Sequence, residues 1–137
     1  SAGSAAFSGV LPGTQDYRIS LVSSAQASNY TLQVIVPARI QFAKGAISAQ
    51  VNGFLQGREV NFYLLRALAG QTMTVNILSP ANDIFLTIYG MQDGSPLVRS
   101  VMGQTSWTGV LPATQDYMIE AVSTGASANY TLQTIVQ

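Results

Sequence analysis

The sequence predicts an all-β protein, an antiparallel, jelly-roll-like β-sandwich of eight to nine strands. Two observations favour this fold class. Apolar and polar residues alternate with a period of two, and short β-branched and aromatic runs are separated by Gly, Pro, Asn and Asp. The clearest alternation sets Met73, Val75 and Ile77 against threonines and an asparagine. This pattern is typical of an antiparallel strand with one buried face and one face in water.

The predicted strands follow one another at short intervals, with turn residues between them. Those in the middle of the chain cover residues 39–42, 47–55, 60–67, 72–78, 84–89 and 97–102. Glycine or proline marks the turns at residues 44–45, 56–57, 69–70, 79–80 and 93–94. The segment 84–89 is apolar on both faces, which indicates a central place in its sheet. Three more strands are expected near Trp107 and over residues 117–122 and 130–136.

The N-terminal part of the chain repeats the C-terminal part at an offset of 100 residues, without a gap. Gly9-Val10-Leu11-Pro12, Thr14-Gln15-Asp16-Tyr17 and Asn29-Tyr30-Thr31-Leu32-Gln33 each recur 100 residues later. The segment between the two copies occurs once. We therefore expect two parts: residues 1–37 as a partial repeat, the C-terminal half of a sandwich, and residues 38–137 as a complete β-sandwich domain.

The composition excludes several classes of function. Charged residues make up 9% of the chain, six basic and six acidic, so no basic field is available for nucleic acid. The chain lacks Cys and His, which removes disulfides, thiol chemistry, the commonest general base and the commonest transition-metal ligand. No apolar run approaches the roughly eighteen residues of a membrane span. We predict a protein that is not an enzyme and needs no cofactor or metal.

Each copy of the repeat contains the pattern of a tyrosine corner, over residues 11–17 and 111–117. In such a corner a tyrosine hydroxyl bonds back to upstream backbone at the edge of a sandwich, so Tyr17 and Tyr117 are predicted to be structural. The neighbouring Asp16 and Asp116 are interpreted as caps of local backbone amides rather than as an acid and a base. Trp107, the counterpart of Phe7, is interpreted as a core residue rather than a platform for a sugar ring.

Four stretches in order, residues 63–71, 86–90, 111–117 and 130–132, resemble the bacterial pre-peptidase C-terminal domain. The resemblance covers residues 39–137. It implies a β-sandwich, secretion or a cell-surface location, and an accessory, non-catalytic role beside secreted peptidases. Some members of that family bind calcium through clustered acidic residues. This chain departs from that pattern, because Asp83 and Asp93 are isolated and Asn61 stands near Glu59 where an acid would help.

The surplus half sandwich predicts an assembly. Such a half exposes an apolar face and unpaired strand edges, and either copy could complete the middle segment, giving an ordinary domain over 39–137 or a circular permutant over 1–100. We expect self-association with identical chains. The candidate assembly residues are Phe7, Val10, Leu11, Ile19, Val22, Tyr30 and Leu32.

The function expected from these features is that of a non-catalytic extracellular structural or adhesive repeat, such as a filament subunit, that assembles through its N-terminal half-copy. The alternative is an accessory binding or spacer module of a secreted hydrolase. Neither nucleic acid nor a membrane span is expected in either case. A carbohydrate or protein ligand stays open.

Overall fold

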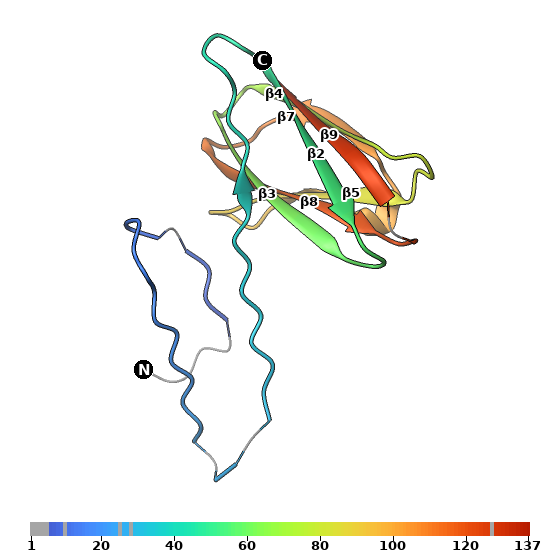
Figure 1. The fold of residues 1–137 in the computed structure, drawn as a ribbon. Coiled ribbons are helices and arrows are strands. Elements are labelled where there is room, and N and C mark those ends of the chain that lie inside the picture. The colour runs from blue at the N-terminus through green and yellow to red at the C-terminus, as the bar shows by residue number, and fades with distance from the viewer. Residues whose placement is uncertain (1–5, 10, 25, 28, 127) are drawn as a thin grey trace. The chain divides into compact units, whose positions relative to one another are not determined.

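The computed structural model describes the whole chain except residues 1–5, 10, 25, 28 and 127. The chain divides into two compact units, Ser1–Val34 and Ile35–Gln137, which are described separately; the expected boundary between residues 37 and 38 stays a prediction. The second unit confirms the antiparallel β-sandwich (Figure 1). Its described strands are β1 (Ala38–Arg39), β2 (Ser48–Leu55), β3 (Val60–Ala67), β4 (Thr72–Leu78), β5 (Ile84–Gly90), β6 (Pro96–Val98), β7 (Ser106–Val110), β8 (Gln115–Ser123) and β9 (Ala128–Val136).

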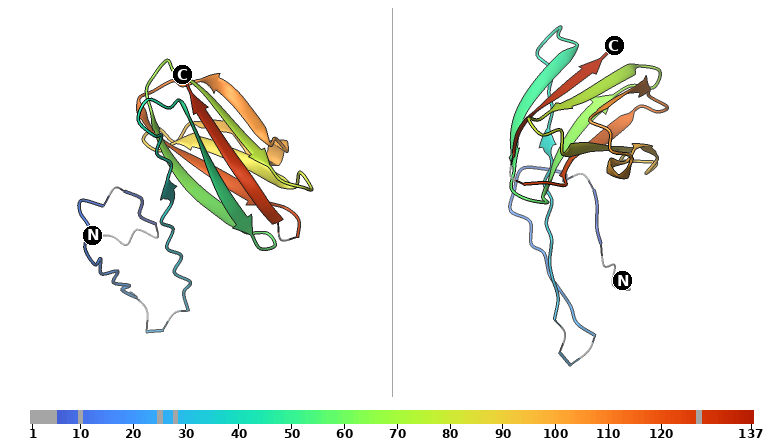
Figure 2. Two further views of the ribbon diagram at one scale, coloured as in Figure 1. Left: turned by 45° about the horizontal axis from the view of Figure 1, so that its top comes forward. Right: turned by 90° about the vertical axis from the view of Figure 1, so that its right-hand side faces the viewer.

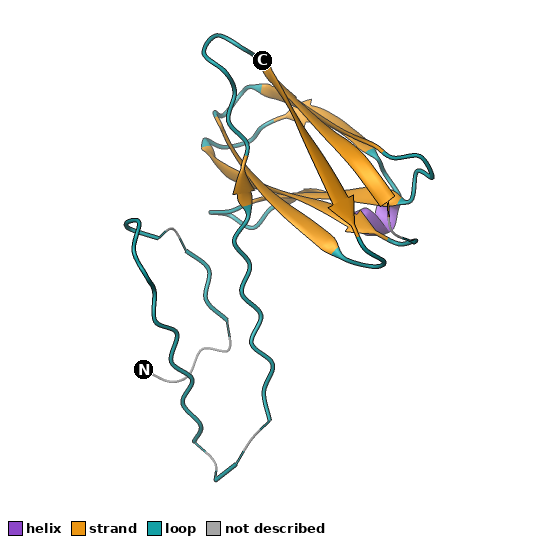
Figure 3. Cartoon of the chain, viewed as in Figure 1, coloured by secondary structure: helices purple, strands orange, loops and turns teal. Residues whose placement is uncertain are grey.

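The strands form two sheets, which Figures 2 and 3 show from three directions. The five-stranded sheet has the order β1-β3-β8-β5-β6, and the four-stranded sheet has the order β2-β9-β4-β7. All described pairs are antiparallel except β1 with β3. The core lies between the sheets and contains the inward side chains of both, among them Leu55, Leu65, Met73, Ile84, Leu86, Ile88, Tyr117, Ile119 and Leu132.

The alternation of apolar residues placed most strands correctly. Strands β3 and β4 begin and end where the sequence predicted, and Gly45, Gly57, Gly70 and Gly94 occupy the expected turns with positive φ.

Two strands are shorter than expected by two residues or more. Strand β1 ends at Arg39; the next residue, Ile40, is buried in the core, and its amide still donates to Leu64 O at 2.8 Å. Strand β6 ends at Val98, and the 3₁₀ helix η1 (Ser100–Met102) follows. There the Ser100 amide donates to Thr87 Oγ1 at 2.9 Å instead of to a neighbouring strand.

The N-terminal copy does not form the strands that its sequence predicted near Phe7 and over residues 17–22 and 30–36; its described residues contain none. The reason is competition for the same strand partners. The C-terminal copy already pairs on both sides, β8 with β3 and β5, and β9 with β2 and β4.

The apolar side chains of this copy are consequently exposed, Phe7 by 87% and Val22 by 92%. Among the other candidate assembly residues, Leu11, Ile19, Tyr30 and Leu32 are exposed, and Val10 lies outside the described residues.

Candidate functional site

The outer face of the four-stranded sheet is mostly polar, and its strands carry no charged residue. Rows of side chains run across its strands, as in the row Gln50, Gln133, Asn76 and Ser106. These groups bond to one another: Ser106 Oγ donates to Asn76 Oδ1 at 2.6 Å, and Asn76 Nδ2 donates to Gln133 Oε1 at 3.4 Å. Since the polar groups already have partners within the sheet, this face has the character of an ordinary solvated sheet surface.

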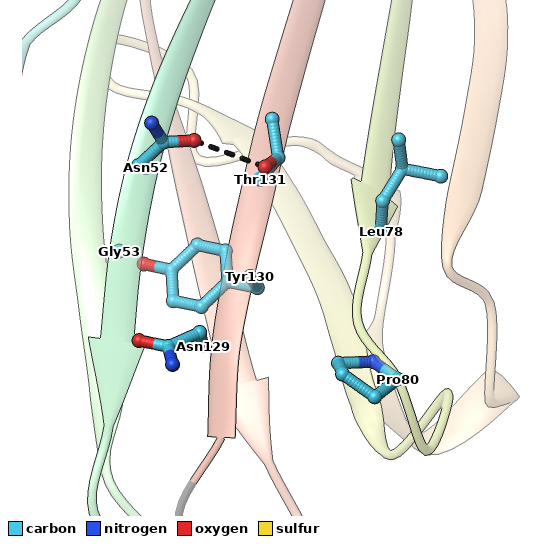
Figure 4. A pocket seen from close by; sticks show the side chains of 7 residues that line it. All are labelled: Asn52, Gly53, Leu78, Pro80, Asn129, Tyr130 and Thr131. Atoms are coloured by element: carbon cyan, nitrogen blue, oxygen red, sulfur yellow. Dashed lines mark hydrogen bonds between the residues drawn. The ribbon is translucent and has the colours of Figure 1, made fainter.

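A largely open hollow of about 410 Å³ lies at one end of this face (Figure 4). Thr131 Oγ1 donates to Asn52 Oδ1 across it at 3.0 Å. The Tyr130 ring lies against Gly53, where a Cβ would come within 2.3 Å of the ring. The lining contains no charged side chain and therefore no acid–base pair; it consists of Asn52, Gly53, Leu78, Pro80, Asn129, Tyr130 and Thr131.

The outer face of the five-stranded sheet is apolar instead. The inward residues of β3, β8 and β5 alternate with an outward set that is mostly half-buried. We call this set the apolar face; its members are Val60, Phe62, Leu64, Phe85, Thr87, Tyr89, Met118, Glu120 and Val122. This composition makes the face the candidate binding surface, because a solvated sheet surface is normally polar.

An ion pair borders the apolar face. Arg39 on β1 donates to both carboxylate oxygens of Asp116 on β8, at 3.0 and 2.9 Å. This hydrogen bonding lowers the pKa of Asp116 and raises that of Arg39. The interpretation of Asp116 as a cap of local amides is therefore wrong. Its side chain points outward from β8, opposite Arg66, where Arg39 can reach it.

A single carboxylate lies in the middle of the apolar face. Glu120 is flanked by Phe62 on β3 and Thr87 on β5, and the Tyr89 hydroxyl donates to it. Burial raises the pKa of Glu120. Burial, together with the Glu120 charge, raises the pKa of Tyr89 to about 12. The face therefore holds a partly desolvated acid whose hydrogen-bond partner is a tyrosine.

Glu120→Gln is expected to stabilise the protein at pH 7 by about 0.5 kcal/mol, a modest effect because solvent screens a partly exposed group. A carboxyl whose pKa is raised by folding contributes stability below its unfolded pKa, and this contribution is lost as pH rises through the folded pKa. Urea unfolding of both proteins from pH 3 to pH 8 should show the difference growing with pH. A difference that does not change with pH would contradict this assignment.

Both copies form the same hydrogen-bonded closure around their tyrosine. Tyr117 Oη donates to Ala113 O at 2.6 Å and accepts from Ala113 N at 3.3 Å. Tyr17 Oη makes the equivalent bonds to Gly13 O at 2.6 Å and Gly13 N at 3.1 Å. The two sites differ in burial, since Tyr117 is 0% exposed and Tyr17 is 39% exposed.

The structural role of the two tyrosines stays a prediction that a matched pair of variants tests. Tyr117→Phe is expected to lower the unfolding free energy by about 1–2 kcal/mol, because it leaves a partly buried carbonyl and amide without their partner. Tyr17→Phe is expected to change it by less than about 0.5 kcal/mol. Chemical denaturation of the two variants measures both values. Equal effects would contradict a special role for the buried corner.

The remaining sequence candidates are structural in their contacts. Trp107 is partly buried and packs against the core. Asp93 accepts from Ser95 N at 2.9 Å and from Gln115 Nε2 at 3.0 Å, and Glu59 accepts from Gln56 N at 3.1 Å. Over the residues that the structure describes, no group of three or more acidic side chains is placed to hold a metal ion.

The residues of the apolar face were missed in the sequence. The available signal was in residues 60–67. Tyr63 and Leu65 are apolar on one face of this strand, and Phe62 and Leu64 are equally apolar on the other face. The same signal in residues 84–89 was interpreted as a central position only. Apolar residues at both parities also occur when the outer face of a sheet binds a partner.

Comparison with known proteins identifies the family. No family model and no curated protein matches the chain. The solved structure of PliG from Aeromonas hydrophila, a periplasmic inhibitor of g-type lysozyme, does match, with 31% identity and a TM-score of 0.65. The match covers 74% of this chain and 96% of that protein. The chain belongs to the PliG family.

Two further structures are similar to the chain to different degrees. PliG from Salmonella Typhimurium has 21% identity and a TM-score of 0.58. The match covers 74% of this chain and 97% of that protein. The pre-peptidase C-terminal domain of Bacillus anthracis collagenase has 12% identity and a TM-score of 0.49, with 78% of this chain and 100% of that domain covered. The resemblance to the pre-peptidase C-terminal family is therefore supported only weakly.

Membership of the PliG family corrects the expected function and partner. PliG of Aeromonas hydrophila and PliG of Salmonella Typhimurium are inhibitors of g-type lysozyme, so the expectations of a structural or adhesive repeat, of a filament and of a hydrolase accessory module are wrong. Self-association with identical chains is contradicted in the same way. The predicted secreted or cell-surface location is confirmed by the periplasmic location of these relatives. In the described part of the chain, no helix has the length and apolarity needed to span a membrane.

Proposed function

We propose that this PliG-family chain is a non-enzymatic inhibitor of a g-type lysozyme, and that it binds the enzyme through the apolar face. The observation that carries the proposal is the 31% identity to Aeromonas hydrophila PliG over 96% of that protein. An inhibitor needs a binding surface rather than catalytic groups. This requirement agrees with a chain that has neither His nor Cys.

The apolar face is the surface best suited to a protein partner. It contains two phenylalanines, a tyrosine and a methionine, which are residue types enriched in the centres of protein–protein interfaces. Arg39, Asp116 and Arg66 provide a charged border on one side. The outer face of the opposite sheet is mostly made of amides and hydroxyls, some of which bond to one another, with Phe54, Leu78, Val110 and Ile135 among them.

The charge balance bears on how the complex would form. Six basic and six acidic residues give a net charge of zero, so long-range attraction contributes little and burial of apolar surface supplies most of the binding free energy. The affinity is accordingly expected to depend weakly on salt.

The direct test is inhibition of a purified g-type lysozyme by the purified chain. Lysis of a peptidoglycan suspension should slow as the chain is added and stop once it saturates the enzyme, and a complex should elute in size-exclusion chromatography. A lysozyme of another type is the specificity control. Full lysis in a large molar excess of the chain, with no complex, would refute the proposal.

A further inference from the structure

The N-terminal copy preserves nearly all the core residues of the strands that it duplicates. Among the inward positions of β8 and β9 and the turn before β8, eight are buried and are identical in the N-terminal copy: Leu111, Gln115, Tyr117, Ile119, Ser123, Tyr130, Leu132 and Val136. A segment without a core of its own gains nothing from this set of residues. The set matches the space that β7, β8 and β9 fill.

The two copies also share local geometry that does not depend on a sheet. Both close the same tyrosine hydroxyl bonds. In both, an aromatic ring covers a glycine two residues later: a Cβ on Gly109 would lie 2.5 Å from the Trp107 ring, and a Cβ on Gly9 would lie 2.9 Å from the Phe7 ring. The N-terminal copy thus keeps two local contacts of the segment that it duplicates.

The sheet connections allow the N-terminal copy to take those places. Strand β9 ends beside the start of β2, where Ile135 lies opposite Ser48. If Ile35 took the place of Ile135, residues 36–47 would form a loop from one strand to its antiparallel neighbour, a length that costs little to close. The exchange releases β1, and with it the Arg39–Asp116 ion pair.

We propose that residues 7–36 can take the places of β7, β8 and β9 within the same chain, and that this exchange abolishes binding through the apolar face. In the exchanged state Arg18 replaces Met118 and Ser20 replaces Glu120. Met118 is buried between Leu64 and Tyr89 at the centre of that face. A cation at this position makes the centre of the face unsuitable for apolar contact; this effect on inhibition rests on the proposed function, whereas the exchange itself does not.

One core position favours the C-terminal copy. Ala121 is 0% exposed on β8, and its counterpart is the larger Leu21. A larger side chain in a filled core strains its surroundings, so the exchanged state is the minor one. Leu21→Ala removes this difference and should increase the exchanged population.

Engineered cysteines test the exchange in the full chain, which has no Cys of its own. Gln50 lies directly opposite Gln133, so the exchange would bring Gln33 opposite Gln50. Directly opposed strand residues have the separation that a disulfide requires. Gln33→Cys with Gln50→Cys should therefore form an intramolecular disulfide in a thiol–disulfide redox buffer. The matched control is Gln26→Cys with Gln50→Cys, because Gln26 would fall in the β8–β9 turn.

Peptide mapping of monomeric, non-reduced protein should show several-fold more disulfide for the Gln33 pair than for the Gln26 pair. Adding Leu21→Ala should raise the yield further. Equal yields for the two pairs, or a disulfide found only between chains, would overturn the exchange.

A second readout uses Trp107, the one tryptophan of the chain. In Leu21→Ala with Ala121→Leu, its emission should shift to longer wavelength while the far-ultraviolet circular dichroism keeps its β signal. Unchanged emission, or loss of the β signal, would argue against the exchange. The disulfide-trapped protein should lose inhibition of g-type lysozyme if the unmodified protein has it; trapped protein that still inhibits would overturn the switch. If the unmodified protein itself does not inhibit, the proposed function fails, and the disulfide yield still decides the exchange.

Discussion

Leu132→Ala is expected to lower the free energy of unfolding by about 2–5 kcal/mol, whereas Leu32→Ala should change it by less than about 0.5 kcal/mol. The two leucines occupy equivalent places in the two copies, but Leu132 is 0% exposed in the core and Leu32 is 50% exposed. The first substitution leaves a cavity between the sheets, and the second removes a side chain that already meets water. Urea denaturation of the two variants measures both values.

This pair tests which copy completes the sandwich. The surrounding residues Tyr-Thr-Leu-Gln are identical in the two copies, so local propensity is the same and only burial differs. Equal losses of stability would contradict the structure, because they would mean that both copies pack in a core. A larger loss for Leu32→Ala would mean that the N-terminal copy fills the strand places of the native sandwich.

The second large effect is expected on binding. Phe62→Ala combined with Phe85→Ala should weaken inhibition of g-type lysozyme by about thirty-fold or more, because truncation of an aromatic side chain at the centre of an interface typically costs about 2 kcal/mol or more. Both rings lie on the apolar face, on β3 and β5. Inhibition titrations with the variant and the unmodified protein provide the comparison.

The matched control is Phe54→Ala. Phe54 is 53% exposed on the outer face of the four-stranded sheet, so the same chemical change is made on the other side of the sandwich and should leave inhibition unchanged. Thermal unfolding of all the variants separates loss of binding from loss of structure. If Phe54→Ala weakens inhibition and the double variant does not, the binding surface is on the four-stranded sheet.

Alternation in the sequence could predict the core strands because burial on one face imposes a period of two. Residues 72–78 illustrate this: Met73, Val75 and Ile77 are all buried, and strand β4 has the predicted bounds. The same pattern misled in the N-terminal copy. Its residues have the strand pattern, but a strand also needs a neighbour, and β8 and β9 already hold the positions next to β2, β3, β4 and β5.

The binding surface could not be located from the sequence for a related reason. A strand with apolar residues at both parities can be covered on its outer face by more protein of its own chain or by a partner. The choice depends on the layer order of the fold. Only the two-sheet arrangement shows that no further layer of the sandwich covers the outer face of β3, which carries Phe62 and Leu64.

The ion pair between Arg39 and Asp116 could not be predicted from the sequence either. Arg39 and Asp116 are far apart in the chain, and β1 pairs with β3 in parallel, a pairing for which no short hairpin signal exists. The assignment of Asp116 to its own turn followed from local rules alone. The long-range contact replaced the local one because Asp116 points outward on β8, which only β3 separates from β1.

The central claim is that the outer face of the five-stranded sheet binds a g-type lysozyme, and methyl NMR of the labelled chain tests it most directly. Addition of unlabelled g-type lysozyme should shift or broaden the methyl signals of Leu64, Met118 and Val122. The signals of Leu78 and Ile135 on the outer face of the four-stranded sheet should stay in place. Perturbation confined to Leu78 and Ile135, or no perturbation of either set, would contradict the account.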